Sequence, residues 1–189
     1  ARELPSADAP QLLVTGTLAD VVEDQFRRLL DDAGVGPVAF FPPRRSGELP
    51  AVGRGTRVLL AQPFLADTAR VLLERGASLV TAPFPLGVEG TTAWLEAAAA
   101  AMGGDPQRLR SAIAAPADRA RRALARQRTR LEGKRIFFFP DSQLEVPLAR
   151  FLARELGMQP VEVGTPYLHR RHLAAELALL PSGTQLSEG

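Results

Sequence analysis

The sequence contains no cysteine among its 189 residues, and histidine, lysine, tyrosine and tryptophan are all scarce. Without cysteine the chain can build no disulfide framework, offer no thiol nucleophile and ligate no iron–sulfur centre through thiolates. Its histidines are His169 and His172, so a zinc site would also need carboxylates. The apolar runs last only a few residues, far short of the ~20 that a membrane-spanning helix needs, and we expect no membrane insertion.

The remaining composition is that of an ordinary globular protein, with 46% hydrophobic and 23% charged residues. This length suits one large domain or two small ones, and the composition excludes disorder, collagen and coiled coil. The chain begins at Ala1 instead of Met and shows no signal-peptide pattern, so we interpret it as an internal piece of something longer.

The segment 105–135 stands apart because it carries a net charge of +7, while both flanking segments are slightly acidic. Its apolar residues recur at helical spacing, and we expect Pro116 to begin a second helix that ends at Gly133. A nucleic-acid interface would normally offer aromatic side chains for stacking, and this segment has none. We therefore favour an interface with protein or a solvated helix face, and expect no nucleic-acid partner.

On both sides of this segment, short apolar strands alternate with amphipathic helices. Strands too apolar to have a wet face predict an α/β fold with parallel sheets covered by helices on both faces, a Rossmann-like plan. We expect a complete four-stranded unit and then an unfinished two-stranded one. The expected strands are 11–15, 38–41, 57–61, 78–82, 135–139 and 161–163, and the expected helices are 19–33, 65–76, one around Trp94, 144–156 and 170–180.

Generic nucleotide-binding motifs are absent. Gly53-Arg54-Gly55 is the only G-x-G, but Val58 stands where the third glycine belongs and a strand follows the motif instead of preceding it. The two histidines would lie three residues apart on one helix face, which can chelate metal, with Glu176 a turn further on. The neighbouring arginines make a solvated helix start the favoured interpretation.

The loops that follow the strands carry more information, because ligands of open parallel sheets bind beyond the carboxyl ends of the strands. Three of these five loops begin with proline, and they mix apolar and aromatic groups with few charges. That composition suits a flat, apolar ligand better than a phosphate, although stiff turns would explain it equally well. The loops are Gly16-Thr17, Pro42–Arg45, Gln62–Phe64, Pro83–Thr91 and Pro140–Gln143.

Three long strings resemble one family closely. They are KRIFFFPDSQLEVPLARFLARELGMQPVEVGTPYLHR (134–170), APFPLGVEGTTAWLEAAA (82–99) and LPAVGRGTRVLLAQPFLADTARVLLERGA (49–77). Their order and content resemble the N subunits of light-independent protochlorophyllide reductases, and more loosely the catalytic subunits of nitrogenases. The resemblance covers nearly the whole chain.

The resemblance implies an ATP-dependent oxidoreductase that reduces one ring double bond of protochlorophyllide to chlorophyllide in (bacterio)chlorophyll biosynthesis. It implies a cytoplasmic heterotetramer of N and B subunits, served by an iron–sulfur L protein that uses ATP. In this family a 4Fe–4S cluster is bound by the first of three α/β domains of the N subunit and by the B subunit. Since this chain has no cysteine, we expect that first domain to be missing and the 189 residues alone to be inactive.

By analogy with the family, residues 1–104 form the middle α/β domain, 105–133 a basic helical connector and 134–189 the start of the third domain. The resemblance implies a substrate cavity lined by strand-end loops, with no catalytic or metal-binding residue in this chain. The expected lining residues are Gln62, Pro63, Phe64, Leu65, Pro83, Phe84, Leu86, Pro140, Asp141, Ser142, Gln143 and Leu144.

Three other interpretations compete with this one. The chain could belong to a related nitrogenase-like subunit, such as a chlorophyllide reductase or a cofactor-assembly scaffold, although the FPDSQLE string (139–145) speaks against these. A non-enzymatic ligand-binding protein with two α/β units, or a dimerisation module built on the basic connector, would belong to a different functional class.

Overall fold

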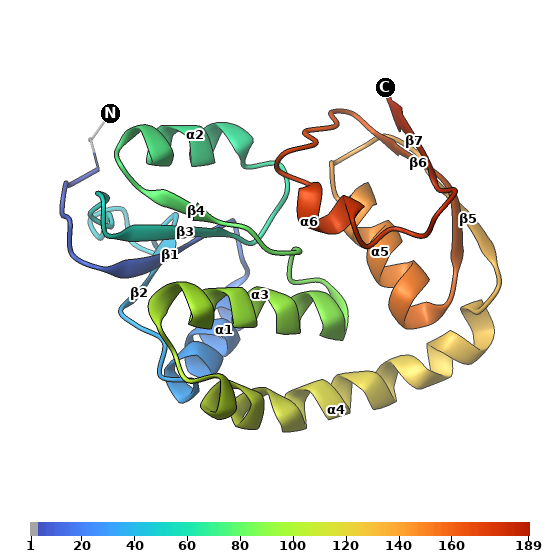
Figure 1. Ribbon diagram of the computed structural model, residues 1–189, viewed down its shortest axis with the longest axis horizontal. Coiled ribbons are helices and arrows are strands. Elements are labelled where there is room, and N and C mark those ends of the chain that lie inside the picture. The colour runs from blue at the N-terminus through green and yellow to red at the C-terminus, as the bar shows by residue number, and fades with distance from the viewer. Residues whose placement is uncertain (1–3) are drawn as a thin grey trace. The chain divides into compact units, whose positions relative to one another are not determined.

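Two parallel sheets form the framework of the chain in the computed structural model, which describes residues 4–189 (Figure 1). Each sheet belongs to one of two folded units. The first unit comprises Ala1–Thr81 and Leu95–Ile113, and the second comprises Ala82–Trp94 and Ala114–Gly189. The parallel α/β architecture expected from the sequence is confirmed.

The first unit contains a four-stranded sheet whose strands are all parallel. In spatial order β2-β1-β3-β4, its strands are β1 (Gln11–Thr15), β2 (Val38–Phe41), β3 (Thr56–Leu60) and β4 (Ser78–Val80). Leu12, Leu13 and Val14 of β1 are fully buried, because successive side chains of an interior parallel strand face covered sides of the sheet. All four strands were predicted to within two residues at either end.

Helices cover both faces of this sheet. Figure 1 shows α1 (Asp20–Asp32) and α2 (Ala66–Glu74) on opposite faces. Helix α1 buries Phe26 and Leu30 and ends before Gly34, whose φ of 71° favours glycine. Further apolar side chains of this unit come from the later part of α3 (Gly87–Met102) and the first part of α4 (Pro106–Leu131), namely Leu95, Ala98, Ala99, Leu109 and Ile113.

The expectation that Pro116 begins a second helix is wrong. Helix α4 runs from Pro106 to Leu131 with Pro116 inside it. A proline removes one backbone hydrogen bond from a helix, here the bond to the carbonyl of residue 112. The alanines around it at 112, 114, 115 and 117 have the highest helix propensity, and they keep the helix continuous.

The second unit contains a three-stranded parallel sheet, not the two-stranded one expected. Its strands β5 (Arg135–Phe138), β6 (Gln159–Thr165) and β7 (Gln185–Glu188) lie in the order β5-β6-β7. Strand β7 was missed because its sequence, QLSE, has no apolar run. It is held by pairing with β6 and by a 2.8 Å hydrogen bond from the Ser187 hydroxyl to Glu162.

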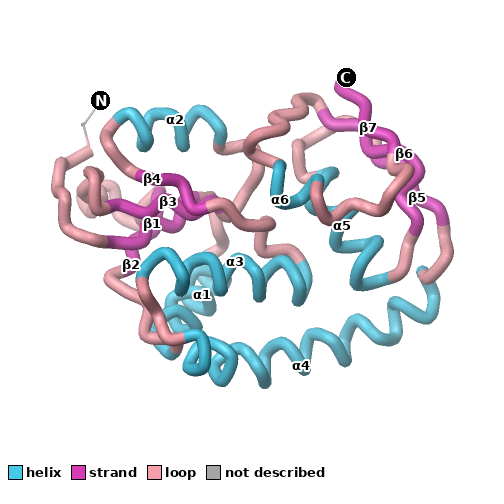
Figure 2. Tube along the Cα trace, viewed as in Figure 1, coloured by secondary structure: helices cyan, strands magenta, loops and turns pink. Residues whose placement is uncertain are grey.

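Helices α5 (Glu145–Leu156) and α6 (Ala174–Leu177) lie on one face of this sheet (Figure 1). Helix α5 was predicted from the sequence. The expected helix over 170–180 is wrong, because only Ala174–Leu177 is helical and the chain on either side runs as loops and turns, drawn pink in Figure 2. Nδ1 of His169 accepts the backbone N–H of His172 at 3.2 Å, which forms a turn where a longer helix would have begun.

Strand β5 has an exposed side. Phe137 is 50% exposed and the neighbouring Phe139 is 77% exposed, and their rings meet edge to face with centroids 6.0 Å apart. An exposed aromatic pair at the end of a strand is typical of surface that another part of a protein covers.

Candidate functional site

The carboxyl edge of the first sheet has its switch point between β1 and β3. The chain passes from β1 to β2 on one side and then to β3 on the other, so the strand exits diverge there, and such crevices are common ligand sites. Gln62, which follows β3, is hydrogen-bonded across this point to Thr17, which follows β1. Its Oε1 accepts the backbone N–H of Thr17 at 2.8 Å, and its Nε2 donates to the carbonyl of Thr17 at 3.0 Å.

Both polar atoms of the Gln62 side chain are therefore hydrogen-bonded to the backbone, and the side chain does not present its amide to a ligand. Its neighbours differ in exposure: Pro63 is buried, Leu65 is half-buried and Phe64 is 41% exposed. Among the predicted lining residues of this loop, Phe64 is the one that offers an apolar surface at the sheet edge.

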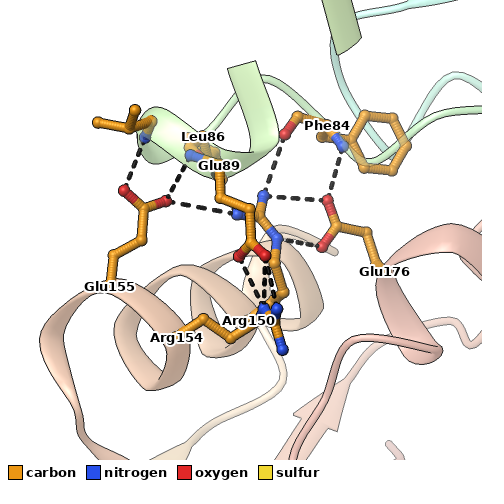
Figure 3. Close-up of polar contacts among 8 residues, drawn as sticks. Phe84, Leu86, Glu89, Arg150, Arg154, Glu155 and Glu176 are labelled. Carbon is orange, nitrogen blue, oxygen red and sulfur yellow. Dashed lines mark hydrogen bonds and ion pairs between the residues drawn. The ribbon is translucent and has the colours of Figure 1, made fainter. Parts of the chain in front are cut away.

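In the second unit, Arg150 organises the segment that contains Pro83, Phe84 and Leu86. The guanidinium is fully buried, and its Nε donates to Oε2 of Glu176 at 2.8 Å (Figure 3). Its Nη2 donates to the carbonyl of Phe84 at 3.1 Å and its Nη1 to the carbonyl of Leu86 at 3.0 Å. A buried charge is tolerated only when it is paired and hydrogen-bonded, and this one is both.

Glu176 completes the arrangement from α6. Its Oε1 accepts the backbone N–H of Phe84 at 2.6 Å and a 3.3 Å contact from Nη2 of Arg150, and its side chain is also fully buried. The backbone of Phe84 is thus held through both its N–H and its carbonyl. Because neither partner reaches water, the pair fixes the shape of this loop more firmly than any surface contact would.

Glu155 caps the start of α3. Its Oε2 accepts the N–H of Val88 at 2.7 Å and its Oε1 the N–H of Glu89 at 3.2 Å, so a carboxylate faces the positive end of the helix (Figure 3). The sequence predicted a loop through residue 91, and this cap is why the helix instead begins at Gly87. A Cβ on Gly87 would lie 2.0 Å from Oε1 of Glu155, so the approach needs glycine.

A second ion pair lies one helical turn from Arg150 but is open to solvent. Arg154 contacts both carboxylate oxygens of Glu89, with Nε at 2.8 and 2.7 Å. Hydrogen bonding to Arg154 lowers the pKa of the Glu89 carboxyl, against the opposing effect of partial burial. The buried Arg150–Glu176 pair thus joins α5 to α6, and the exposed Arg154–Glu89 pair joins α5 to the start of α3.

The loop that follows β5 contains the remaining predicted residues, and Glu145 shapes it. Oε1 of this buried side chain accepts the backbone N–H groups of Asp141 at 2.9 Å and Ser142 at 2.6 Å. Next to them, Gln143 has a φ of 67°, in the left-handed region. Pro140 packs against Gly164 of β6, where a Cβ would lie 2.8 Å from the proline ring, and Leu144 is half-buried.

The two histidines lie in a turn and not on a helix. Their ring centroids are 5.1 Å apart, and Tyr167 stacks edge-on against His169 at 5.9 Å. Burial lowers the pKa of the His172 imidazole, with smaller contributions from the charges of His169 and Arg171. Within residues 4–189, no three His, Cys, Asp or Glu side chains gather so that they could hold a metal ion.

The structure therefore brings two of the three predicted lining segments, those around Phe84 and Gln143, into the same unit, whereas Gln62–Leu65 belongs to the other. Sequence patterns missed the charges that hold these loops, Arg150, Glu155 and Glu176. One signal was available, because Arg150 lies four residues after Val146, on the apolar stripe of α5.

Comparison with known proteins identifies the family. The family model described as nitrogenase component 1 type oxidoreductase matches residues 13–186. The chain belongs to this family. A nitrogenase structure, described as nitrogenase Cp1 at pH 6.5, has the same fold, with a TM-score of 0.66 and 21% identity over 98% of this chain and 46% of that one.

Closer relatives confirm the resemblance seen in the sequence. The chain is 63% identical over 187 residues to light-independent protochlorophyllide reductase subunit N of Rubrivivax gelatinosus, and 66% identical over 189 residues to that of Bradyrhizobium sp. strain BTAi1. These matches cover 99% and 98% of this chain but 44% of each relative. The chain thus spans less than half the length of the curated relatives that it matches.

In the part of the chain that the structure describes, no helix has the length and apolarity needed to cross a membrane.

Proposed function

We propose that this chain is part of the N subunit of a light-independent protochlorophyllide reductase, which reduces a ring double bond of protochlorophyllide to chlorophyllide. The observation that carries the proposal is the 63–66% identity to subunits of that name over at least 98% of the chain. Membership of the nitrogenase family supports the proposal, because such oxidoreductases receive their electrons from a separate ATP-dependent partner protein. The working enzyme is then a cytoplasmic heterotetramer of N and B subunits with an iron–sulfur L protein.

The residues present do not fit the 4Fe–4S cluster of such an enzyme. Cluster irons are held by cysteine thiolates, and the sequence has none. Among the described residues 4–189, carboxylates and imidazoles form no alternative ligand group either. We therefore place the cluster elsewhere in the assembly and ATP on the L protein, and assign no electron-transfer step to these residues.

The role that we propose for this chain is to shape the tetrapyrrole site. Phe64 and Leu144 offer apolar surface at strand exits, and the Arg150–Glu176 pair fixes the backbone around Phe84. A flat macrocycle suits such rigid, largely apolar walls. In the full subunit, residues 1–104 would form the middle domain, 105–133 the connector and 134–189 the start of the third domain.

A chimera tests this proposal directly. The matching segment of the full-length Rubrivivax gelatinosus subunit N is replaced by these 189 residues, and the chimera is purified with its B subunit. Supplied with L protein, ATP and protochlorophyllide in the dark, it should form chlorophyllide, followed by absorbance. A chimera that assembles normally but forms no chlorophyllide would contradict the proposal.

The same chimera tests the lining residues. Phe64→Asp places a charge on the exposed ring position without disturbing the core, and should weaken protochlorophyllide binding about tenfold in a spectroscopic titration. Val71→Asp, on the exposed face of α2, is the matched control and should leave the affinity unchanged. Equal affinity of the Phe64 and Val71 variants would remove Phe64 from the site.

A further inference from the structure

Gln143 has a backbone conformation that its side chain makes unfavourable. Within residues 4–189 it is the one residue other than glycine with a positive φ, at 67°. Side chains with a Cβ rarely adopt this region, and residues held there cluster at binding sites and switches. Asparagine or glycine would meet the geometry at lower cost, so the position calls for an explanation in terms of the glutamine side chain.

Glu145 holds the strained turn in place. Its Oε1 accepts two backbone N–H groups and the hydroxyl of Ser142, and the Ser142 hydroxyl in turn accepts the N–H of Leu144 at 3.4 Å. Residues on both sides of Gln143 are therefore tied down. The carboxylate is 4% exposed, so these bonds are shielded from competing water.

The side chain that this turn presents has no partner of its own. In the described part of the chain, the structure gives the half-buried carboxamide of Gln143 no hydrogen bond. Two buried oxygens at the same edge of the β5-β6-β7 sheet also lack partners there, Oε2 of Glu145 and Oγ1 of Thr165. Buried polar atoms are nearly always paired, so these two buried oxygens, at the edge where Gln143 lies, indicate that a ligand or partner completes this edge of the sheet.

We propose that Gln143 determines specificity in the tetrapyrrole site, with its Nε2 donating a hydrogen bond to a carbonyl or carboxylate oxygen on the rim of the macrocycle. This inference rests on the proposed function. The left-handed turn fixes the backbone from which the amide extends, and the amide would add a direction that apolar surface such as that of Leu144 does not supply. A single directional donor in such a site fixes which edge of a flat ligand enters first.

Three substitutions in the chimeric enzyme test the inference. Gln143→Leu removes the donor and should raise the dissociation constant for protochlorophyllide about 3- to 10-fold. Gln143→Glu places a carboxylate against the ligand oxygen and should weaken binding further than Gln143→Leu. Gln143→Gly relieves the backbone, so it should fold with an unchanged or higher Tm and yet bind as weakly as Gln143→Leu.

Gln159→Leu is the matched control, since this exposed glutamine begins β6 at the opposite edge of the sheet; its affinity should equal that of the wild type. If Gln143→Gly binds protochlorophyllide as tightly as the wild type, the side chain has no role and the inference fails. If the unsubstituted chimera neither binds nor reduces protochlorophyllide, the proposed function itself fails. The two failures are therefore distinguishable.

Discussion

Replacing Arg150 by methionine should destabilise the second unit severely. The substitution keeps most of the side-chain volume but removes the positive charge from a site that is fully buried. Glu176 would then remain as a buried carboxylate with the N–H of Phe84 as its one recorded donor among the described residues. The carbonyls of Phe84 and Leu86 would each lose the donor that Arg150 supplies.

The size of the effect follows from these losses. Removing one member of a buried ion pair costs about 3–5 kcal/mol, mostly because the other charge is left uncompensated. A domain of this size is stable by about 5–15 kcal/mol, so the loss is a large fraction of the total. With a urea dependence of about 1–1.5 kcal/mol per molar, the unfolding midpoint should fall by roughly 2–5 M.

The assay is urea unfolding of the 189-residue chain followed by tryptophan fluorescence. Trp94 is the only tryptophan, it is fully buried, and it belongs to the second unit. Arg154→Met is the control, because it removes an equivalent arginine one turn along the same helix. That side chain is 43% exposed, so solvent screens its pair with Glu89 and the loss should not exceed about 1 kcal/mol.

Equal losses in the two arginine variants would refute the reasoning. The double variant Arg150→Met, Glu176→Leu gives a second check, since it removes both charges and should be more stable than Arg150→Met alone. If the double variant is the less stable one, the energy of the network lies in its backbone hydrogen bonds and not in charge burial.

Two further predictions concern the same unit and its turns. Gly87→Ala should lower the free energy of unfolding by about 2–3 kcal/mol in a urea titration, because φ is 71° and the new Cβ would collide with Glu155. Gly103→Ala is the control: its φ is 69° but its Cβ would meet no atom, so the loss should be about 1 kcal/mol. Equal losses would exclude the collision with Glu155. Burial lowers the pKa of His172, so the unfolded chain takes up a proton more readily than the folded one and stability falls as pH drops below about 6.5. His172→Gln should flatten the dependence of Tm on pH between 7 and 5, and an unchanged slope would contradict this assignment.

Strands that consist of short apolar runs were predictable in both sheets. Sequence and structure agree within one residue at each end of β1 (Gln11–Thr15), β2 (Val38–Phe41) and β5 (Arg135–Phe138). Strand β7 could not be found in this way, because its QLSE sequence has no apolar run. The helix expected over 170–180 is wrong, because only Ala174–Leu177 is helical and a turn closed by the N–H of His172 on Nδ1 of His169 precedes it.

Topology determines only which loops could contribute to the candidate site. Parallel strands place their exit loops at one edge of each sheet, and this principle selects five loops. The resemblance to the family narrowed them to the loops around Gln62, Phe84 and Gln143. It does not say which side chains remain available. Gln62 has the same carboxamide as Gln143, yet its oxygen and nitrogen are both hydrogen-bonded to the backbone of Thr17. That difference depends on a contact 45 residues away in sequence.

The buried charges explain why the segment 82–94 belongs to the second unit although it follows directly on strand β4 of the first. Phe84 and Leu86 bond to Arg150, and the start of α3 bonds to Glu155, so the segment receives its hydrogen bonds from α5 and α6. The loop after β5 is pinned by Glu145 of the same α5. One helix thus holds both of the predicted lining segments in this unit, and a substitution that loosens α5 should disturb the two together.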